Sequence, residues 1–279
     1  MITINIDPVI HIGPISITWY GVMVALAVLT IVSWLLWQVK RGANISYNTA
    51  LTAALIGIPS GVIIAKLIHV VDNIVVAKLH PELVSSGAVI DYTQYPELIF
   101  SGAGLTAWGA VLGAALGIWI YSRFSKFQYV YFIDTITPGI ILSQAVGRVG
   151  CVLNGCCYGV AAPDWWPLSI VYTHPNSGSC TAGIVHPTHF YELIYNLIVF
   201  GVLLLLKGKL KPDGSLFLVY LSLYSAWRIG IGFLREGTPF LFGLHQAQVI
   251  GIIILAIAIP LLVMKTRWIK PEDRNQPVE

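Results

Sequence analysis

Long apolar stretches, separated by short polar segments, run along almost the whole chain. A helix that spans a membrane needs about 20 consecutive, mostly apolar residues. The pattern predicts seven such helices, over about 16–38, 49–72, 101–122, 128–147, 189–206, 214–235 and 245–266. The fifth reaches span length only by including the polar positions between His189 and Glu192. The expected fold is therefore an all-α, polytopic membrane helix bundle, with residues 1–279 forming a single integral membrane domain.

The composition supports this pattern and excludes a water-soluble domain. Of the 279 residues, 56% are hydrophobic and only 10% are charged, whereas an ordinary soluble domain carries about a quarter charged residues. Too few polar side chains remain to cover a surface that faces water. The net charge of +3 gives no indication of nucleic acid as a partner.

The positions of the basic residues predict how the chain is oriented in the membrane. Cytoplasmic loops carry an excess of Lys and Arg. Eleven of the 16 basic residues fall on one side of the predicted spans: Lys40, Arg41, Arg123, Lys126, Lys207, Lys209, Lys211, Lys265, Arg267, Lys270 and Arg274. That side is expected to be cytoplasmic, with the C-terminus there and the N-terminus outside. The long segment 148–188 then forms an extracytoplasmic head loop. The first apolar run precedes its basic residues, which is unlike a secretory signal, so we expect it to be retained.

A few basic residues lie where a membrane protein should avoid them. Arg228 falls inside the sixth predicted span, seven residues before Arg235 and so about 10 Å deeper along a helix. A charge at that depth costs at least a few kcal/mol unless a partner or a water-filled cavity relieves it. Tyr224 lies four residues before Arg228 and shares its helix face. Arg148 ends the fourth predicted span, and Lys66 lies within the second.

Several cationic side chains in the outer half of a bundle predict an anionic ligand. Arginine is suited to bidentate binding of phosphate, and in a membrane the simplest source of phosphate is a phospholipid head group. The structural alternative is that Arg228 pairs with a buried carboxylate, Asp134 or Glu192, for architecture alone. Arg235 alone is also interpretable as a residue that extends to the membrane surface.

All four cysteines, Cys151, Cys156, Cys157 and Cys180, fall in or beside the predicted head loop. An extracytoplasmic compartment permits disulfides, and four cysteines allow three pairings if two bridges form. The spacing is unlike that of a familiar zinc site, so no metal is assigned, although a site that adds His174 or His186 stays an alternative. Free thiols are the third possibility. The sequence implies no cofactor.

Five stretches, in order along the chain, carry a resemblance to a known family. They are SITWYGVMVALA (16–27), GLTAWGAVLGA (104–114), GRVGCVLNGCCYG (147–159), HPTHFYE (186–192), and YSAWRIGIGFLRE (224–236) with HQAQ (245–248). Together they resemble the motifs of the prolipoprotein diacylglyceryl transferases. In the third stretch, the positions that match the family signature are Gly147, Arg148, Gly150, Asn154 and Gly159. The resemblance covers nearly the whole chain.

The resemblance implies an activity and a set of residues. Family members transfer the diacylglyceryl group of phosphatidylglycerol to the thiol of the lipobox cysteine of a prolipoprotein, and glycerol-1-phosphate leaves. It also implies a multi-pass protein of the bacterial cytoplasmic (inner) membrane, among membrane lipids. The expected catalytic residues are Arg148, Arg228, Tyr20, Tyr224, Glu192 and His186. The expected contacts to phosphatidylglycerol are Arg148, Arg228, Arg235, Lys66, Asn154 and Gly159.

The chain also departs from the family pattern. Cys151 and Cys156 stand where the signature has Asn and Glu, Trp108 where many members have His, and Gly232 where the sixth span usually has Glu. The general base stays unidentified among His186, His189 and Glu192, while His69 and His245 are interpreted as packing residues. Two alternatives therefore remain open. One is a weakened member that binds phospholipid or lipoprotein precursor without turnover, and the other is a membrane thiol-disulfide oxidoreductase.

Overall fold

The computed structural model describes residues 1–79, 81, 84, 89–100, 106–235 and 241–268, and it confirms a polytopic membrane helix bundle. The chain divides into two compact units, one made of Met1–Gln38 and Val130–Glu279 and the other of Val39–Tyr129. The division falls in the last turn of one helix and at the first residue of another. The prediction of a single domain over 1–279 is not tested by this division.

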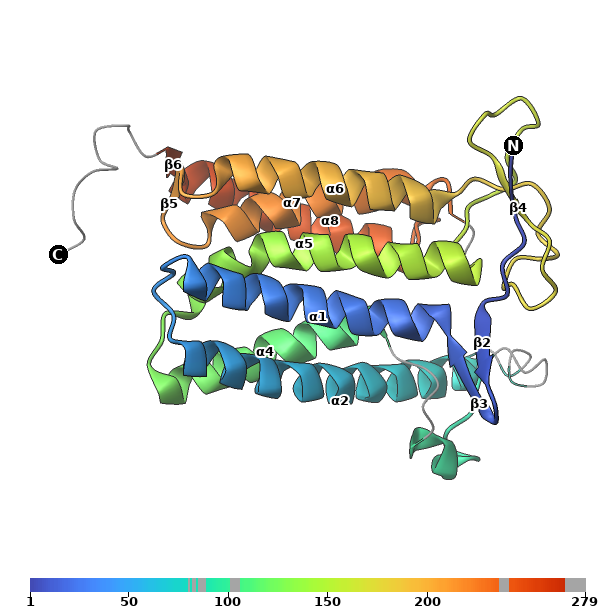
Figure 1. The fold of residues 1–279 in the computed structure, drawn as a ribbon, viewed down its shortest axis with the longest axis horizontal. Helices are drawn as coiled ribbons and strands as arrows, with labels where there is room; N and C mark the ends of the chain where they lie inside the picture. Colours follow the sequence, from blue (N-terminus) through green and yellow to red (C-terminus); the bar gives the residue numbers. More distant parts are fainter. Residues whose placement is uncertain (80, 82–83, 85–88, 101–105, 236–240, 269–279) are drawn as a thin grey trace. The chain divides into compact units, whose positions relative to one another are not determined.

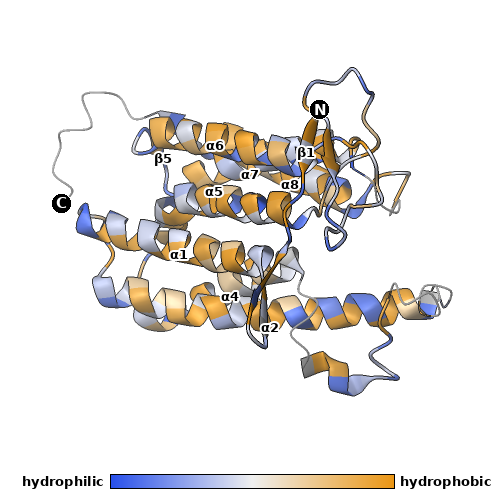
Figure 2. Cartoon of the chain, turned by 45° about the vertical axis from the view of Figure 1, so that its right-hand side comes forward, coloured by the Kyte–Doolittle hydropathy of each residue, from blue (hydrophilic) through white to orange (hydrophobic). Residues whose placement is uncertain are grey.

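Within the described ranges the long helices are α1 (Trp19–Lys40), α2 (Tyr47–Leu79), α4 (Ala107–Ser125), α5 (Tyr129–Asn154), α6 (Thr188–Leu206), α7 (Ser215–Gly232) and α8 (Gln246–Lys265). Six of them are long and apolar enough to cross a membrane; α4 is not among these six. Orange, apolar positions dominate the helices in Figure 2.

Two helix boundaries differ from the sequence-based expectation for identifiable reasons. The first helix begins at Trp19 rather than at 16, because β3 (Ile15–Thr18) pairs in antiparallel register with β2 (Val9–Ile12). The fourth predicted span, which was expected to end at 147, continues to Asn154 as α5. Arg148 therefore lies within a helix and not at its end. Of the third predicted span, residues 101–105 lie outside the described residues.

Short strands close both ends of the first unit (Figure 1). At one end, β1 (Ile2–Ile4) runs parallel to β4 (Ile170–Tyr172), so the N-terminus is built into the segment between α5 and α6. Ile170, Tyr172 and Val185 form a small apolar core there. At the other end, β5 (Leu210–Lys211) pairs with β6 (Arg267–Trp268). The chain's beginning and the end of α8 therefore lie at opposite ends of this unit.

The second unit is held by glycines. Three of them, Gly109, Gly113 and Gly117, recur every four residues on α4, opposite Gly57 and Gly61 on α2. A Cβ on Gly113 would come within 2.4 Å of the Ser60 carbonyl oxygen. The two backbones therefore pack closely, as small residues at four-residue spacing allow in membrane helices. The unit also contains a 3₁₀ turn, η1 (Pro96–Phe100).

Candidate functional site

A polar column runs through the apolar interior of the first unit, where α5, α6 and α7 lie side by side (Figure 1). Each helix contributes polar residues spaced by four, so that they share one face. The column consists of Gln144 and Arg148 on α5, Glu192 and Asn196 on α6, and Tyr220, Tyr224 and Arg228 on α7.

Glu192 is the centre of this column. Its side chain is only 2% exposed, and its Oε1 accepts a hydrogen bond of 2.7 Å from Nη2 of Arg148. Its Oε2 lies 3.3 Å from Nη1 of Arg228. The hydroxyl of Tyr224 donates to Oε1 at 3.4 Å. One buried carboxylate therefore holds two arginines from two other helices, and it confines both guanidinium groups to one place.

This cluster of three charges is not electrically balanced. Two guanidinium groups and one carboxylate leave a net charge of about +1, and burial makes that charge costly without a counter-ion. The Nε of Arg228 is buried and has no hydrogen-bond partner among the described residues. A guanidinium carries five N–H donors, so the cluster keeps donor capacity for an anion in addition to Glu192.

The two carboxylates that the sequence offered as partners of Arg228 take different roles. Arg228 pairs with Glu192, as described above. Asp134, at the start of α5, instead accepts hydrogen bonds from the backbone N–H groups of Gly214 (2.7 Å) and Phe217 (2.8 Å). It therefore satisfies donors at the N-terminus of α7, where a negative charge is favourable.

The column continues away from the charges. Gln144 Nε2 donates to the Tyr220 hydroxyl at 2.8 Å, and the Tyr220 ring stacks on Tyr224 with 5.9 Å between centroids. Asn196, one turn from Glu192, is 0% exposed, and neither amide atom has a hydrogen-bond partner among the described residues. The sequence analysis missed Gln144, Asn196 and Tyr220. Their four-residue spacing from Arg148, Glu192 and Tyr224 was the available signal.

Tyr20 lies at the start of α1, beside the same stretch of α5. A Cβ on Gly150 would come within 2.9 Å of Met23 Cβ and 3.4 Å of Tyr20 Cα. The glycine at position 150 therefore lets α1 approach α5 two residues after Arg148. This contact brings Tyr20 close to the arginine-bearing turn, although 44% of the tyrosine is exposed.

Arg235 and Gly159 belong to the segment that covers this end of the helices. The Arg235 Nη2 lies 3.4 Å from the carbonyl oxygen of Cys157. Gly159 forms a β-bridge with Arg235, and its N–H donates to the His186 carbonyl at 2.8 Å. A Cβ at Gly159 would meet the Leu234 carbonyl oxygen at 2.3 Å. Both residues thus hold backbone in place, and a contact with lipid stays a prediction.

The two histidines of HPTHFYE lie in different surroundings. His186 contacts the Tyr191 hydroxyl through Nδ1 at 3.4 Å, and its ring lies 5.9 Å from that of Trp166. His189 is fully buried, with Nε2 at 3.0 Å from the Tyr172 hydroxyl. Burial raises the pKa of Tyr172. The contacts of the two imidazoles described here are with Tyr191, Trp166 and Tyr172 and not with Glu192, so a catalytic role for His186 stays a prediction.

Lys66 and Asn154 are the remaining predicted contacts to phosphatidylglycerol. Lys66 is on α2 in the second unit, with its Nζ over the Tyr92 ring at 5.5 Å from the centroid. Nearby, Asn73 donates to the His69 carbonyl at 2.9 Å. Asn154 ends α5, and its carbonyl accepts from the Gly178 N–H at 3.3 Å. Their roles in lipid binding stay predictions.

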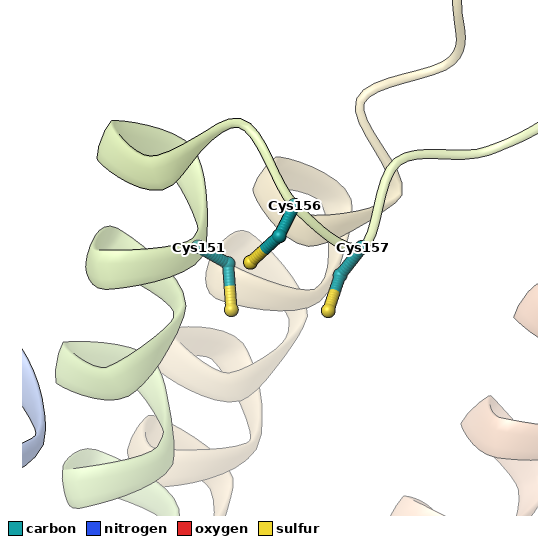
Figure 3. Close-up of side chains that lie close together, drawn as sticks. All are labelled: Cys151, Cys156 and Cys157. Atoms are coloured by element: carbon teal, nitrogen blue, oxygen red, sulfur yellow. The ribbon is translucent and has the colours of Figure 1, made fainter. Parts of the chain in front are cut away.

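Three of the four cysteines gather where α5 ends (Figure 3). The sulfur atoms of Cys151, Cys156 and Cys157 all lie within 4.8 Å of one another. All four cysteines are free thiols in this structure, and Cys180 is directed elsewhere, 3.5 Å from the Pro175 carbonyl. Hydrogen bonds from the neighbouring two thiols lower the pKa of Cys157, and the charges of Arg235 and Arg148 act in the same direction. The predicted disulfides stay untested.

Gly232, one of the departures from the family pattern, packs against Gln248 of α8. A Cβ on Gly232 would meet the side chain of Gln248 at 2.5 Å. Gln248 is buried, donates to the Ile229 carbonyl and accepts from the His245 N–H. A side chain at position 232 would therefore displace the Gln248 side chain from these hydrogen bonds. Trp108 is on α4, and its side chain lies outside the described part of the chain.

The fold and the site together define a class: an integral membrane protein whose helices hold a buried, net-positive cluster suited to an anion. Comparison with known proteins narrows this class. The family model for prolipoprotein diacylglyceryl transferase matches residues 8–264. The chain belongs to this family.

Named relatives agree with that assignment. A protein of Dehalococcoides mccartyi called phosphatidylglycerol–prolipoprotein diacylglyceryl transferase is 48% identical over 276 residues, covering 99% of this chain and 100% of its own. A protein of the same name from Symbiobacterium thermophilum is 32% identical, with 92% of each chain covered. Another from Clostridium tetani is 29% identical, with 81% of this chain and 83% of its own covered.

Proposed function

We propose that this protein transfers the diacylglyceryl group of phosphatidylglycerol to the thiol of the lipobox cysteine of a prolipoprotein, forming a thioether. The observation that carries the proposal is the Glu192 carboxylate holding both Arg148 and Arg228 inside the bundle. Family membership supplies the substrate class, and the cluster supplies the means to bind its phosphate.

The charge balance of the reaction fits this cluster. A sulfur–carbon bond forms to the diacylglyceryl carbon while the carbon–oxygen bond to phosphate breaks, and the phosphate oxygen keeps the electron pair. The phosphodiester enters with one negative charge, and the departing glycerol-1-phosphate gains a second until it takes up the thiol's proton. Preorganised donors that meet developing charge stabilise a transition state most. Arg148 and Arg228 are positioned to do so, because Glu192 holds them before substrate arrives.

Glu192 acts in this scheme as a positioning residue. Its two oxygens already accept from Arg148, Arg228 and Tyr224. The proton of the incoming thiol therefore needs another acceptor, and the leaving phosphate is the natural one at the end of the reaction.

We further propose that the protein lies in the bacterial cytoplasmic membrane with its N-terminus outside and its C-terminus in the cytoplasm. Two observations support this. Basic residues of the first unit gather at one end, around β5 and β6. The N-terminal strand and the long segment after α5 pair at the opposite end. The arginine cluster, near the end of α5, then faces the outer leaflet.

A direct transfer assay tests the proposal. Purified protein in vesicles that contain phosphatidylglycerol is mixed with a lipobox peptide, and the mass of the peptide is followed. We expect a diacylglyceryl adduct with the wild-type chain. We expect its loss with Arg148→Ala and with Arg228→Ala, while Lys265→Ala, an exposed cation at the end of α8, keeps full activity.

The result also decides between transferase and binding protein. If the adduct forms with both arginine variants as well as it does with the wild-type chain, the phosphate clamp is refuted. Phosphatidylglycerol bound by the wild-type chain without any adduct, under conditions where a related enzyme produces one, would instead identify a member without turnover.

A further inference from the structure

The three-thiol cluster at the end of α5 has no part in the phosphate clamp, yet the backbone is arranged to assemble it. Gly155 follows α5 with φ of +65°, and the Cys156 N–H donates to the Cys151 carbonyl at 3.2 Å. This six-to-one bond is that of a Schellman motif, which places the third residue from the helix end beside the second residue after it. The motif therefore brings Cys151 and Cys156 together.

Cys157 joins them through an uncommon backbone conformation. Its φ is +60°, a left-handed value that costs a residue with a side chain of the order of 1 kcal/mol or more. Its carbonyl oxygen is held by the Thr188 hydroxyl at 2.7 Å and by Arg235 at 3.4 Å. With the backbone held in this way, the Cys157 sulfur lies within 4.8 Å of the other two sulfur atoms (Figure 3). Backbone held in a costly conformation commonly marks a functional site.

We infer that Cys151, Cys156 and Cys157 bind a thiophilic divalent cation, Zn²⁺, through three thiolates, with the fourth position open. A tetrahedral zinc site with bonds of about 2.3 Å places its sulfur atoms about 3.8 Å apart. The observed separations, all within 4.8 Å, need a closure of about an ångström. Catalytic zinc sites characteristically have three protein ligands and one open position.

The charge of the neighbouring group suits this site. Three thiolates around a divalent cation carry a net charge of −1. Arg148 Nη1 lies 3.7 Å from the Cys151 sulfur, while Nη2 of the same side chain binds Glu192. One guanidinium therefore touches both the thiol cluster and the phosphate clamp. Cys157 is exposed, which leaves the cluster open to a fourth ligand.

The fourth ligand follows from the proposed function, on which this part of the inference rests. It is the thiol of the acceptor cysteine, bound as a thiolate, which is the nucleophilic form. A coordinated thiol loses its proton outright, and that proton ends on the leaving phosphate. The sulfur–carbon bond then forms as the carbon–oxygen bond breaks. No electrons are gained or lost by the metal, so the step needs no oxidant or reductant.

Cobalt substitution tests the metal site without reference to activity. The full chain, reduced and freed of metal by a chelator, is titrated with Co²⁺ in vesicles. We expect a strong near-ultraviolet thiolate-to-cobalt band and the visible bands of tetrahedral cobalt, both displaced by an equimolar amount of Zn²⁺. Cys151→Ser, Cys156→Ser and Cys157→Ser should each lose the thiolate band in large part. Cys180→Ser should keep it.

Absence of the band in the reduced wild-type protein overturns the inference. So does a band that survives in the three serine variants. Alkylation and intact mass under non-reducing conditions add an independent outcome, since a stable disulfide within the trio in the protein as isolated would overturn it in favour of a staple or a redox role.

The acceptor peptide then separates this inference from the proposed function. A lipobox peptide should shift the visible cobalt bands, and the same peptide with serine in place of its cysteine should not. Full transfer by the chelated protein would overturn the role of the metal in activating the acceptor thiol and leave the transferase intact. A metal site that forms normally in a protein unable to transfer would leave the zinc site intact and refute the transferase.

Discussion

The two units of this protein hold their helices together in opposite ways. In the second unit, α2 and α4 meet through glycines, and at Gly113 even one methyl group would collide with Ser60 and Ile64. In the first unit, α5, α6 and α7 meet through a buried carboxylate, two guanidinium groups and a tyrosine. The glycine interface between α2 and α4 needs only complementary shape, whereas the interface among α5, α6 and α7 also needs its buried charges to be compensated.

The difference separates architecture from chemistry. Lipid is as apolar as the side chains it surrounds, so close packing of small residues is a sufficient way to join membrane helices. Ionisable groups inside a membrane are expensive, and they are retained where they serve a site. We therefore assign the proposed site to the unit that contains the polar column, and the charges of this column and the glycine interface should respond differently to mutation.

The largest effect is expected at the centre of the column. Glu192→Ala leaves two buried guanidinium groups without their carboxylate, which should destabilise the protein by about 3–5 kcal/mol and abolish transfer. Chemical denaturation in detergent measures the first effect and the adduct assay the second. Glu192→Gln, which keeps an acceptor, should fall between. A variant as stable and active as the wild type would show that the column has no structural role.

The glycine interface should give the next largest effect, in stability alone. Gly113→Leu forces apart α2 and α4 and should cost about 1–3 kcal/mol by overpacking. Gly201→Leu is the matched control, because a Cβ at Gly201 on α6 meets no atom within 4 Å. The denaturation midpoints of the two variants are compared. Equal midpoints would mean that α2 and α4 do not rely on this contact.

Two tyrosine variants should distinguish an effect on stability from an effect on activity. Tyr224→Phe removes a hydroxyl that donates to Glu192 at 3.4 Å, and Tyr195→Phe removes one that donates to the Leu223 carbonyl at 2.8 Å. Each should cost about 0.5–1.5 kcal/mol of stability. Only Tyr224→Phe should also lower kcat/KM for transfer. An equal kcat/KM in the two variants would show that the Tyr224 hydroxyl has no part in transfer.

The smallest effect is expected at Asn196, where a substitution should raise the stability of the protein rather than lower it. Its buried amide has no partner among the described residues, so Asn196→Leu removes desolvated polar atoms and should stabilise the protein by up to about 1 kcal/mol. Thermal unfolding monitored by tryptophan fluorescence measures this. A loss of stability would instead show that the amide is satisfied in the membrane.

Much of the site was accessible from the sequence. Arg228 and Arg148 stand out because charges in apolar stretches need an explanation, and Glu192 is one of the two carboxylates that the sequence offers as a partner of Arg228. The choice between Glu192 and Asp134 required the structure, because Asp134 is occupied by backbone N–H groups of α7. Lys66 is grouped with the arginines as a cation within a predicted span and as a lipid contact that the resemblance implies, and the structure places it in the other unit.

The end of a helix can also differ from the end that the apolar pattern predicts. The apolar pattern ended the fourth span at 147, yet α5 continues for seven residues to Asn154. Gly155, the cap of α5, is visible in the sequence, but its φ of +65° and the hydrogen bond from the Cys156 N–H to the Cys151 carbonyl are features of the folded chain. That cap both buries Arg148 within a helix and assembles two of the three thiols.

The amino-acid sequence by itself determined the apolar helices and which charges could not be left in lipid, because both follow from the free energy of transferring each residue out of water. It also carried the family motifs. Only the tertiary structure decided that a single carboxylate serves both arginines and that three of four cysteines meet. Such pairings depend on how faces of helices distant in sequence come together, and that is set by packing of the whole unit rather than by local pattern.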